Sequence, residues 1–319
     1  MNIRRLLCMA LLLPTLLPMS ALAQNFSFAL IGDLPYNSYE RRNLPGLLEE
    51  IGQEKVEFVS HDGDIKSGDS VCSDETLRDI LQVFQGSKHP FIYVPGDNEW
   101  TDCHRANNGA YDPVERLKRL RELFFADDMT LGQRRFALEH QSQDPKFSAY
   151  RENTRWQIGR VLFVGLNVPG SNNNWGKGAK PSPEHVARDA ANRAWLAEAF
   201  ARAREQKLLG LVIIIQANPG FDSYKRDSTQ PDGYSGFFNQ LRDETPAFSG
   251  QVLLVHGDTH THRIDQPLRH PKTNETLANF TRVETYGSPF MGWVKAMVDE
   301  RDPRLFRFEP HPYAPGAAP

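Results

Sequence analysis

The chain alternates short apolar runs with segments in which apolar residues recur at helical spacing. Continuous apolar runs closed by polar residues are typical of strands in a sheet that is buried on both faces. They predict strands at residues 26–31, 56–60, 91–94, 161–166, 211–215 and 251–255. The helical spacing predicts helices near residues 40–52, 73–86, 113–125, 183–206 and 235–244. This alternation predicts an α/β fold.

After residue 277 the pattern changes to short stretches separated by turns, namely FTRVETY, GWVKAMVD and LFRFEP. We expect these to form a second, antiparallel sheet layer. Four long segments are rich in Gly, Asn, Asp and Pro, and long loops in a compact domain are usually functional. They cover residues 96–112, 126–150, 167–182 and 216–235, and we expect them to surround one pocket.

Residues 1–23 have the pattern of a secretory signal peptide. A basic start, MNIRR, precedes an apolar stretch, and ALA before Gln24 matches a cleavage site. The apolar stretch is short and is interrupted by Pro14 and Pro18, so it does not predict a membrane span. We therefore expect a periplasmic or secreted protein without a membrane anchor after cleavage, with residues 24–319 as a single domain.

The charge of the remaining chain gives no reason to expect a nucleic acid as a partner. Residues 1–23 contain Arg4 and Arg5 and no acidic residue, which leaves 35 Lys and Arg against 40 Asp and Glu, a net charge of −5. Proteins that bind nucleic acids or anionic membranes usually carry basic patches. The oligomeric state stays open.

Polar side chains of similar chemistry follow several of the predicted strands. Because the carboxyl ends of parallel strands face one crevice in an open α/β sheet, residues far apart in sequence are expected to converge there. Asp, Asn and His are metal ligands, and a cluster supplied by separate strands suits a two-metal centre. The strand ends are Gly32-Asp33, Gly63-Asp64, Gly96-Asp97-Asn98, Asn218-Pro219 and Gly257-Asp258-Thr259-His260.

The order and spacing of these blocks resemble the calcineurin-like metallophosphoesterase superfamily, whose motifs are DxH, GDxxD, GNHD or GNHE, a lone His, and GHxH. The resemblance covers nearly the whole chain after residue 23. It implies a two-layer mixed β-sandwich flanked by α-helices. It also implies two divalent metal ions and the hydrolysis of small phosphate esters.

The match to the first two motifs is incomplete. Asp33 corresponds to the first Asp, but Pro35 stands where the family has its first His. Asp64 corresponds to the Asp whose carboxylate serves both metals in the family. Ser67 replaces the second Asp of that motif. The resemblance therefore implies that one ligand is lost at position 35.

The later motifs are altered in the same direction. Asp97 falls at the Asn ligand of the family and Asn98 at its His, while Gln216 or Asn218 replaces the lone His. Asp258 replaces the first His of GHxH, His260 keeps the second, and His256 is a spare candidate. The expected metal ligands are Asp33, Asp64, Asp97, Asn218, His256, Asp258 and His260.

Oxygen donors thus replace nitrogen donors at most of the altered positions. Hard oxygen ligands shift the preference from zinc and iron toward manganese, magnesium or calcium. Four carboxylates in one crevice would also repel each other strongly without cations. Both arguments favour a metal in the altered site.

The altered third motif affects catalysis. Asn98 takes the place of a His that, in the family, can donate a proton to the leaving group, and an amide cannot do this. His104, in the same loop, is the candidate for a replacement acid. The lost His residues leave a second interpretation open, in which the protein is a weakened or inactive relative that binds a metal, a phosphate compound or a partner.

Two remaining features complete the expectations. Cys72 and Cys103 follow two neighbouring strand ends by short loops, and cysteines usually pair in an oxidising compartment, so we expect a disulfide between them. A doubly wound nucleotide-binding domain is disfavoured, because the chain has neither GxGxxG nor GxxxxGKS.

Overall fold

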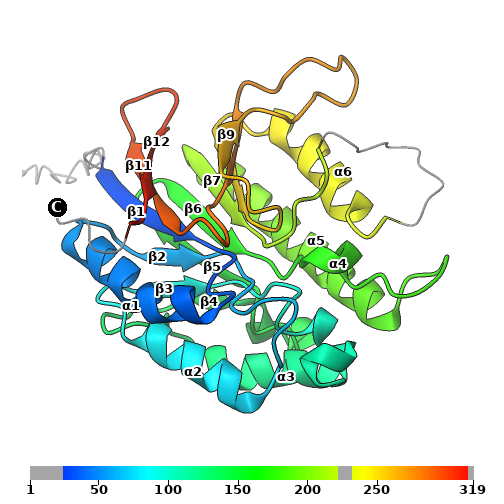
Figure 1. The fold of residues 1–319 in the computed structure, drawn as a ribbon. Coiled ribbons are helices and arrows are strands. Elements are labelled where there is room, and N and C mark those ends of the chain that lie inside the picture. The colour runs from blue at the N-terminus through cyan, green and yellow to red at the C-terminus, as the bar shows by residue number, and fades with distance from the viewer. Residues whose placement is uncertain (1–23, 222–231, 315–319) are drawn as a thin grey trace, which may run out of the picture.

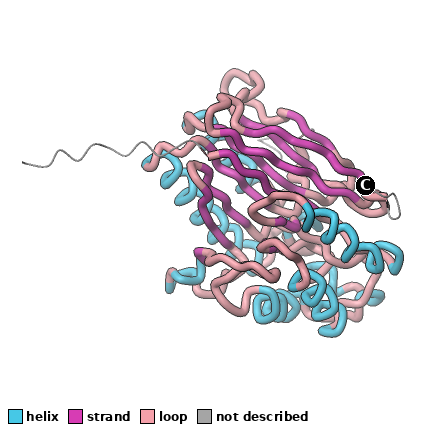
Figure 2. Tube along the Cα trace, turned by 90° about the vertical axis from the view of Figure 1, so that its left-hand side faces the viewer, coloured by secondary structure: helices cyan, strands magenta, loops and turns pink. Residues whose placement is uncertain are grey.

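The computed structural model describes residues 24–221 and 232–314, and the expected signal peptide lies outside these residues. Two β-sheets form the centre of the fold (Figures 1 and 2). Within the described ranges, the first sheet has the order β12 (Phe306–Pro312), β11 (Gly292–Asp299), β1 (Asn25–Ile31), β2 (Val59–His61) and β3 (Phe91–Tyr93). The second has the order β4 (Glu139–His140), β5 (Thr154–Ile158), β6 (Val161–Gly165), β7 (Gly210–Ile214), β8 (Gln251–His256), β10 (Phe280–Glu284) and β9 (Arg263–Asp265).

Helices cover the outer faces of the two sheets. Figure 1 shows α1 and α2 on one side of the molecule and α5 and α6 on the other. The longer helices are α1 (Ser38–Gln53), α2 (Asp74–Gln85), α3 (Pro113–Phe124), α5 (Pro183–Glu205) and α6 (Ser235–Glu244). The short ones are α4 (Gly170–Asn173) and the 3-10 turns η1 (Thr101–His104), η2 (Ala106–Asn108), η3 (Gln141–Gln143), η4 (Pro145–Phe147) and η5 (Thr245–Ala247).

The starts of these helices follow from the sequence. Ser182 caps α5 by accepting a hydrogen bond from the His185 amide at 3.0 Å, with Pro183 in the first turn, as predicted. Asn37 caps α1 in the same way through the amides of Tyr39 and Glu40. In the described part of the chain, no helix has the length and apolar character that crossing a membrane requires.

Three apolar layers hold the fold together. One joins the first sheet to α1, α2 and α3, and another joins the second sheet to α5 and α6. The third lies between the sheets and is rich in aromatic rings. Phe58 packs there with its ring centroid 5.1 Å from that of Phe28 and 5.2 Å from that of Phe163. The fold is therefore the two-layer mixed β-sandwich flanked by helices that the sequence resemblance implied.

The C-terminal strands do not form a layer of their own, so that expectation was wrong. β10 pairs in parallel with β8 in the second sheet, whereas β11 pairs antiparallel with β1 in the first. The earlier strands are divided as well, with β1, β2 and β3 in one sheet and β6, β7 and β8 in the other. A sequence pattern identifies a strand, but the partner of each strand depends on which hydrogen-bonding edge is left free by the others.

The expected disulfide is present and joins the loops that follow β2 and β3. The Cα atoms of Cys72 and Cys103 are 5.7 Å apart, and both residues are fully buried. Cys103 lies in η1, within the segment 96–112. The bond therefore fixes two strand-end loops relative to each other.

Removal of this bond should destabilise the protein. In the chain-entropy model, a closed loop of about 30 residues contributes about 3–4 kcal/mol to the free energy of unfolding. We expect the urea midpoint of the oxidised protein to fall when a reductant is added. The double variant Cys72→Ser/Cys103→Ser is the control, because its midpoint should be low already and insensitive to the reductant. Equal midpoints for parent and double variant would contradict this prediction.

Candidate metal centre

The strand ends of both sheets meet at one place and bring four carboxylates together. Asp33 follows β1, Asp64 follows β2 and Asp97 follows β3, whereas Asp258 arrives from β8 in the other sheet. The first three are only 0%, 3% and 7% exposed. The expected convergence is therefore present, although it is formed by two sheets.

Three of the four carboxylate residues, and His260, have unusual backbone conformations. Asp33, Asp64, Asp258 and His260 all have left-handed backbones, with φ of 48°, 57°, 77° and 55°. Non-glycine residues adopt this region rarely, and Asp and His are among those that tolerate it best. Such residues cluster at functional sites, where the surrounding structure holds them in place.

Direct contacts link the strand ends. The Asp258 amide donates to Asp33 Oδ2 at 2.9 Å, which joins β8 to β1 across the sheets. The backbone amide of Asn98 donates to Asp64 Oδ1 at 3.1 Å, and its side-chain amide donates to Asp64 Oδ2 at 2.8 Å. Asp33 and Asp64 are thus held at fixed positions by their neighbours.

Two further carboxylate oxygens point toward a common place near α4. A Cβ atom added at Gly170 would lie 2.6 Å from Asp97 Oδ1 and 2.7 Å from Asp258 Oδ1. Asp97 Oδ1 is buried and has no hydrogen-bond partner in the structure. A buried, unpaired carboxylate oxygen is costly, and a bound cation is one way to satisfy it.

The electrostatics of the carboxylate cluster also favour a bound cation. Burial raises the pKa of Asp33, and the nearby Asp62 and Asp258 raise it further. Burial also raises the pKa of Asp64, helped by Asp97 and Glu99. Among residues 24–221 and 232–314, no Lys or Arg forms an ion pair with any of the four carboxylates. The buried Lys66 acts on Asp64 and Asp97 through its charge, and His260 lies 3.8 Å from Asp33, so the described residues compensate the four carboxylates only in part.

Glu99 organises the loops beneath the carboxylates. It accepts hydrogen bonds from the Gly96 amide at 2.6 Å and the Tyr93 hydroxyl at 2.8 Å. It also accepts from the amide of Asp64 at 3.1 Å. Lys66 adds to this framework by donating to the Asn98 carbonyl at 2.6 Å. These bonds tie the ends of β2 and β3 together and orient Asp64.

The other residues predicted from the sequence differ in how they contact the carboxylates. His260 reaches the cluster, with Nε2 3.8 Å from Asp33 Oδ1 and Nδ1 2.8 Å from the Ser288 carbonyl. Asn218 contacts Asp258 through its backbone amide at 3.0 Å, while its side-chain oxygen accepts from the Gly220 amide. Gln216 points its side-chain nitrogen at Asp258 Oδ1, 3.4 Å away.

His256 and His104 have other surroundings. His256 is fully buried on β8, and burial lowers its pKa to about 3, with the charges of Arg282 and Arg263 lowering it further. His104 is exposed, and its Nδ1 lies 2.8 Å from the Thr101 carbonyl in its own turn. Their proposed roles as ligand and acid stay predictions.

Sequence reasoning missed two residues that the structure brings to the site. The Tyr36 hydroxyl donates to Asp64 Oδ2 at 2.7 Å, and burial together with Asp64 raises the pKa of Tyr36. The Ser171 hydroxyl lies 2.7 Å from Asp97 Oδ2 and 2.8 Å from Asp102 Oδ1. Position in a strand-end loop was the available indication for both, since Tyr36 follows Asp33 by three residues and Ser171 lies in the segment 167–182.

The side chains of the candidate site are therefore of several residue types. In the described ranges, no three His, Cys, Asp or Glu side chains meet in an arrangement that could hold a metal ion. The carboxylates are instead interleaved with Tyr36, Asn98, Ser171 and Gln216. The unpaired Asp97 oxygen and the partly compensated carboxylates fit a divalent cation, provided that other oxygen donors contribute to its binding.

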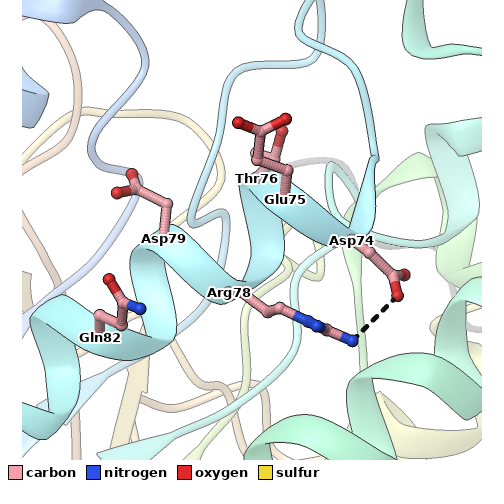
Figure 3. Close-up of a pocket in the computed structure, with 6 residues that line it drawn as sticks. All are labelled: Asp74, Glu75, Thr76, Arg78, Asp79 and Gln82. Carbon is pink, nitrogen blue, oxygen red and sulfur yellow. Dashed lines mark hydrogen bonds and ion pairs between the residues drawn. The ribbon is translucent and has the colours of Figure 1, made fainter.

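A separate hollow, drawn in Figure 3, lies on the outer surface of α2. It has a volume of about 720 Å³ and is lined by Asp74, Glu75, Thr76, Arg78, Asp79 and Gln82. Arg78 reaches Asp74 across one turn at 3.4 Å, as exposed helix pairs do. The strand-end residues do not contribute to this surface, and it has no part in the candidate metal centre.

Comparisons with known proteins agree with the fold. The chain is similar to a dimetal phosphatase from Danio rerio, with a TM-score of 0.52, 13% identity, and coverage of 90% of this chain and 96% of that one. It is also similar to PhoD, with a TM-score of 0.54, 11% identity, and coverage of 92% and 73%. No family model and no curated protein sequence matches the chain. The fold is therefore the one that these two structures share, as the sequence resemblance implied.

Proposed function

We propose that this protein is an exported, metal-dependent phosphoesterase that hydrolyses small phosphate esters with two divalent cations. The observation that carries the proposal is the cluster of four carboxylates at the strand ends. Three of them are buried, cationic side chains compensate the cluster only in part, and Asp97 Oδ1 is unpaired. Similar proteins of this fold include a dimetal phosphatase. The N-terminal pattern of residues 1–23 supports export.

The residues of the crevice divide into two ligand groups in this proposal. Asp33 and His260, 3.8 Å apart, form one group, and Asp97 and Asp258, whose Oδ1 atoms lie near Gly170, form the other. Cations bound there would polarise phosphate oxygens and lower the pKa of a bound water. The many oxygen donors favour manganese, magnesium or calcium over zinc.

Other side chains would position the substrate and the ligands. Arg105 forms an ion pair with Asp102 at 2.8 Å, and its Nη1 lies near Gly68, as does Asn98 Oδ1. Its side chain is 44% exposed. Arg105 can therefore meet a phosphate at the edge of the site, since guanidinium groups bind phosphate oxygens in a bidentate manner. Glu99 keeps Asp64 in place beneath it.

A non-catalytic binding protein is the second candidate, and Asn98 favours it. Asn98 occupies the position at which the family has a proton-donating His, and its side-chain amide is engaged with Asp64 and with the Tyr36 hydroxyl, 2.9 Å away. Such a protein would bind a cation or a phosphate compound in the same crevice without turnover.

Metal removal and replacement test the proposal. We expect the chelated protein to unfold at a lower temperature than protein supplied with Mn²⁺, Mg²⁺ or Ca²⁺, because a ligand at about 100 times its Kd stabilises by about 2.7 kcal/mol. The same ions should restore hydrolysis of nitrophenyl phosphates. Stabilisation without hydrolysis would select the binding protein, and absence of both effects would refute the metal centre.

A further inference from the structure

The Tyr36 hydroxyl lies among the residues expected to bind metal, although the family motifs assign no role to this position. It is 2.7 Å from Asp64 Oδ2 and 3.5 Å from Asp33 Oδ1. It is also 2.9 Å from the Asn98 side-chain nitrogen and 3.3 Å from His260 Nε2. Four side chains from four separate segments therefore surround one phenolic oxygen.

These separations match those of adjacent ligands on one cation. Oxygen ligands about 2.1 Å from an octahedral cation lie about 3.0 Å from their neighbours, because adjacent bonds are perpendicular. The distances from the Tyr36 oxygen to Asp64, Asp33 and His260 fall around this value. A tyrosine that only filled space would not need its hydroxyl within reach of all three.

Glu40, in the first turn of α1, holds Tyr36 in position through the Tyr36 backbone. Glu40 is 1% exposed and accepts a hydrogen bond from the Tyr36 amide at 2.6 Å. It also accepts from the Ser288 hydroxyl at 2.7 Å, and the Ser288 carbonyl in turn contacts His260. The Tyr36 and His260 rings meet edge to face with centroids 5.0 Å apart. One buried carboxylate thus orients both side chains toward the same point.

We propose that the phenolic oxygen of Tyr36 is a ligand of the metal centre and replaces the ligand that is lost at Pro35. Pro35 has no donor side chain, and the next residue extends its hydroxyl to the position between Asp33, Asp64 and His260. The inference rests on the proposed metal centre and identifies a donor type that His, Cys, Asp and Glu do not provide. It accounts for a mixed donor set in the described residues.

Metal affinity and absorption spectra test this role without an activity assay. Phenolate bound to ferric iron absorbs visible light, so the iron(III)-loaded protein should be coloured and should show tyrosine vibrations in resonance Raman spectra. Tyr36→Phe should remove the colour and weaken Mn²⁺ binding, measured by calorimetry, by at least about 10-fold, because loss of an outer partner of a ligand alone costs about 10- to 100-fold. Tyr286→Phe is the control, because Tyr286 stacks on His262 and should leave both readouts unchanged.

The possible outcomes separate this inference from the proposed function. Unchanged or tighter Mn²⁺ binding by Tyr36→Phe, with the iron(III) colour retained, would show that the hydroxyl is not a ligand and would leave the metal centre intact. A parent protein that binds no metal would refute both. The parent spectrum reports tyrosine coordination by itself, so the test does not depend on the folding of the variant.

Discussion

Replacement of Asp64 by asparagine should nearly abolish metal binding. Asp64 is 3% exposed, contacts Tyr36, which also approaches Asp33 and His260, and interacts with the charge of Asp97, so it adjoins both ligand groups of the proposed centre. Loss of an outer partner of a ligand alone costs about 10- to 100-fold in affinity, so loss of this ligand should cost at least about 100-fold. Metal content after dialysis, measured by elemental analysis, is the readout.

Two variants serve as comparisons for Asp64→Asn. His260→Ala should weaken binding of one ion only, because His260 lies on the Asp33 side of the site. Asp69→Asn should change nothing, since Asp69 is an exposed residue of the same loop that accepts a hydrogen bond from Asn107. Metal content equal to that of the parent in Asp64→Asn would mean that the centre is placed wrongly.

The stability of the metal-free variant distinguishes lost ligation from misfolding. Burial and the charges of Asp97 and Glu99 disfavour the charged form of Asp64, so an uncharged side chain removes a repulsion. The amide also leaves one of the two Asn98 donors without its acceptor, so metal-free Asp64→Asn should have a urea midpoint close to that of the metal-free parent. Lower resistance to urea would indicate that the substitution damages the fold rather than the site alone.

Turnover should depend steeply on the acidity of the leaving group. The Asn98 amide is bonded to Asp64 and to Tyr36 and does not titrate near neutral pH, so it cannot protonate the departing oxygen. General acid catalysis typically supplies about 10²- to 10⁴-fold. Nitrophenyl esters, which leave without protonation, should therefore be cleaved far better than alkyl esters.

The slope of rate against leaving-group pKa, for the parent and for His104→Ala, checks this prediction. A steep slope that is unchanged in His104→Ala would confirm that the acid is missing. A shallow slope in the parent that steepens in His104→Ala would contradict it and assign the acid to His104, which would have to turn from its contact with the Thr101 carbonyl. Absence of metal-dependent hydrolysis of any ester would favour the binding protein instead.

The sequence predicted most elements of the fold because their patterns are local. Six apolar runs became strands, and the cap of α5 at Ser182 was correct. β5 was not predicted, because its sequence, TRWQI, interrupts the apolar pattern with polar residues. It forms a hairpin with β6 across Gly159, whose φ is 54°. An apolar run predicts a strand only where the strand is buried on both faces and therefore needs apolar residues at every position.

Some properties of the candidate site were likewise predictable from local sequence, and others were not. The sequence by itself determined that Asp33, Asp64, Asp97 and Asp258 follow strands, since each comes directly after an apolar run and a glycine. It also indicated the disulfide partners, because residues 24–319 contain only Cys72 and Cys103. Both properties depend on residue type and order along the chain.

Only the tertiary structure decided which other side chains join the carboxylates. Whether the hydroxyls of Tyr36 and Ser171 point into the crevice depends on backbone angles and on packing against distant segments such as Ser288 and Asp102. The same holds for the division of the strands between two sheets, since pairing is made by backbone groups that are alike in every residue except proline. Residue order specifies the donors, whereas their meeting in space depends on contacts between segments more than 200 positions apart.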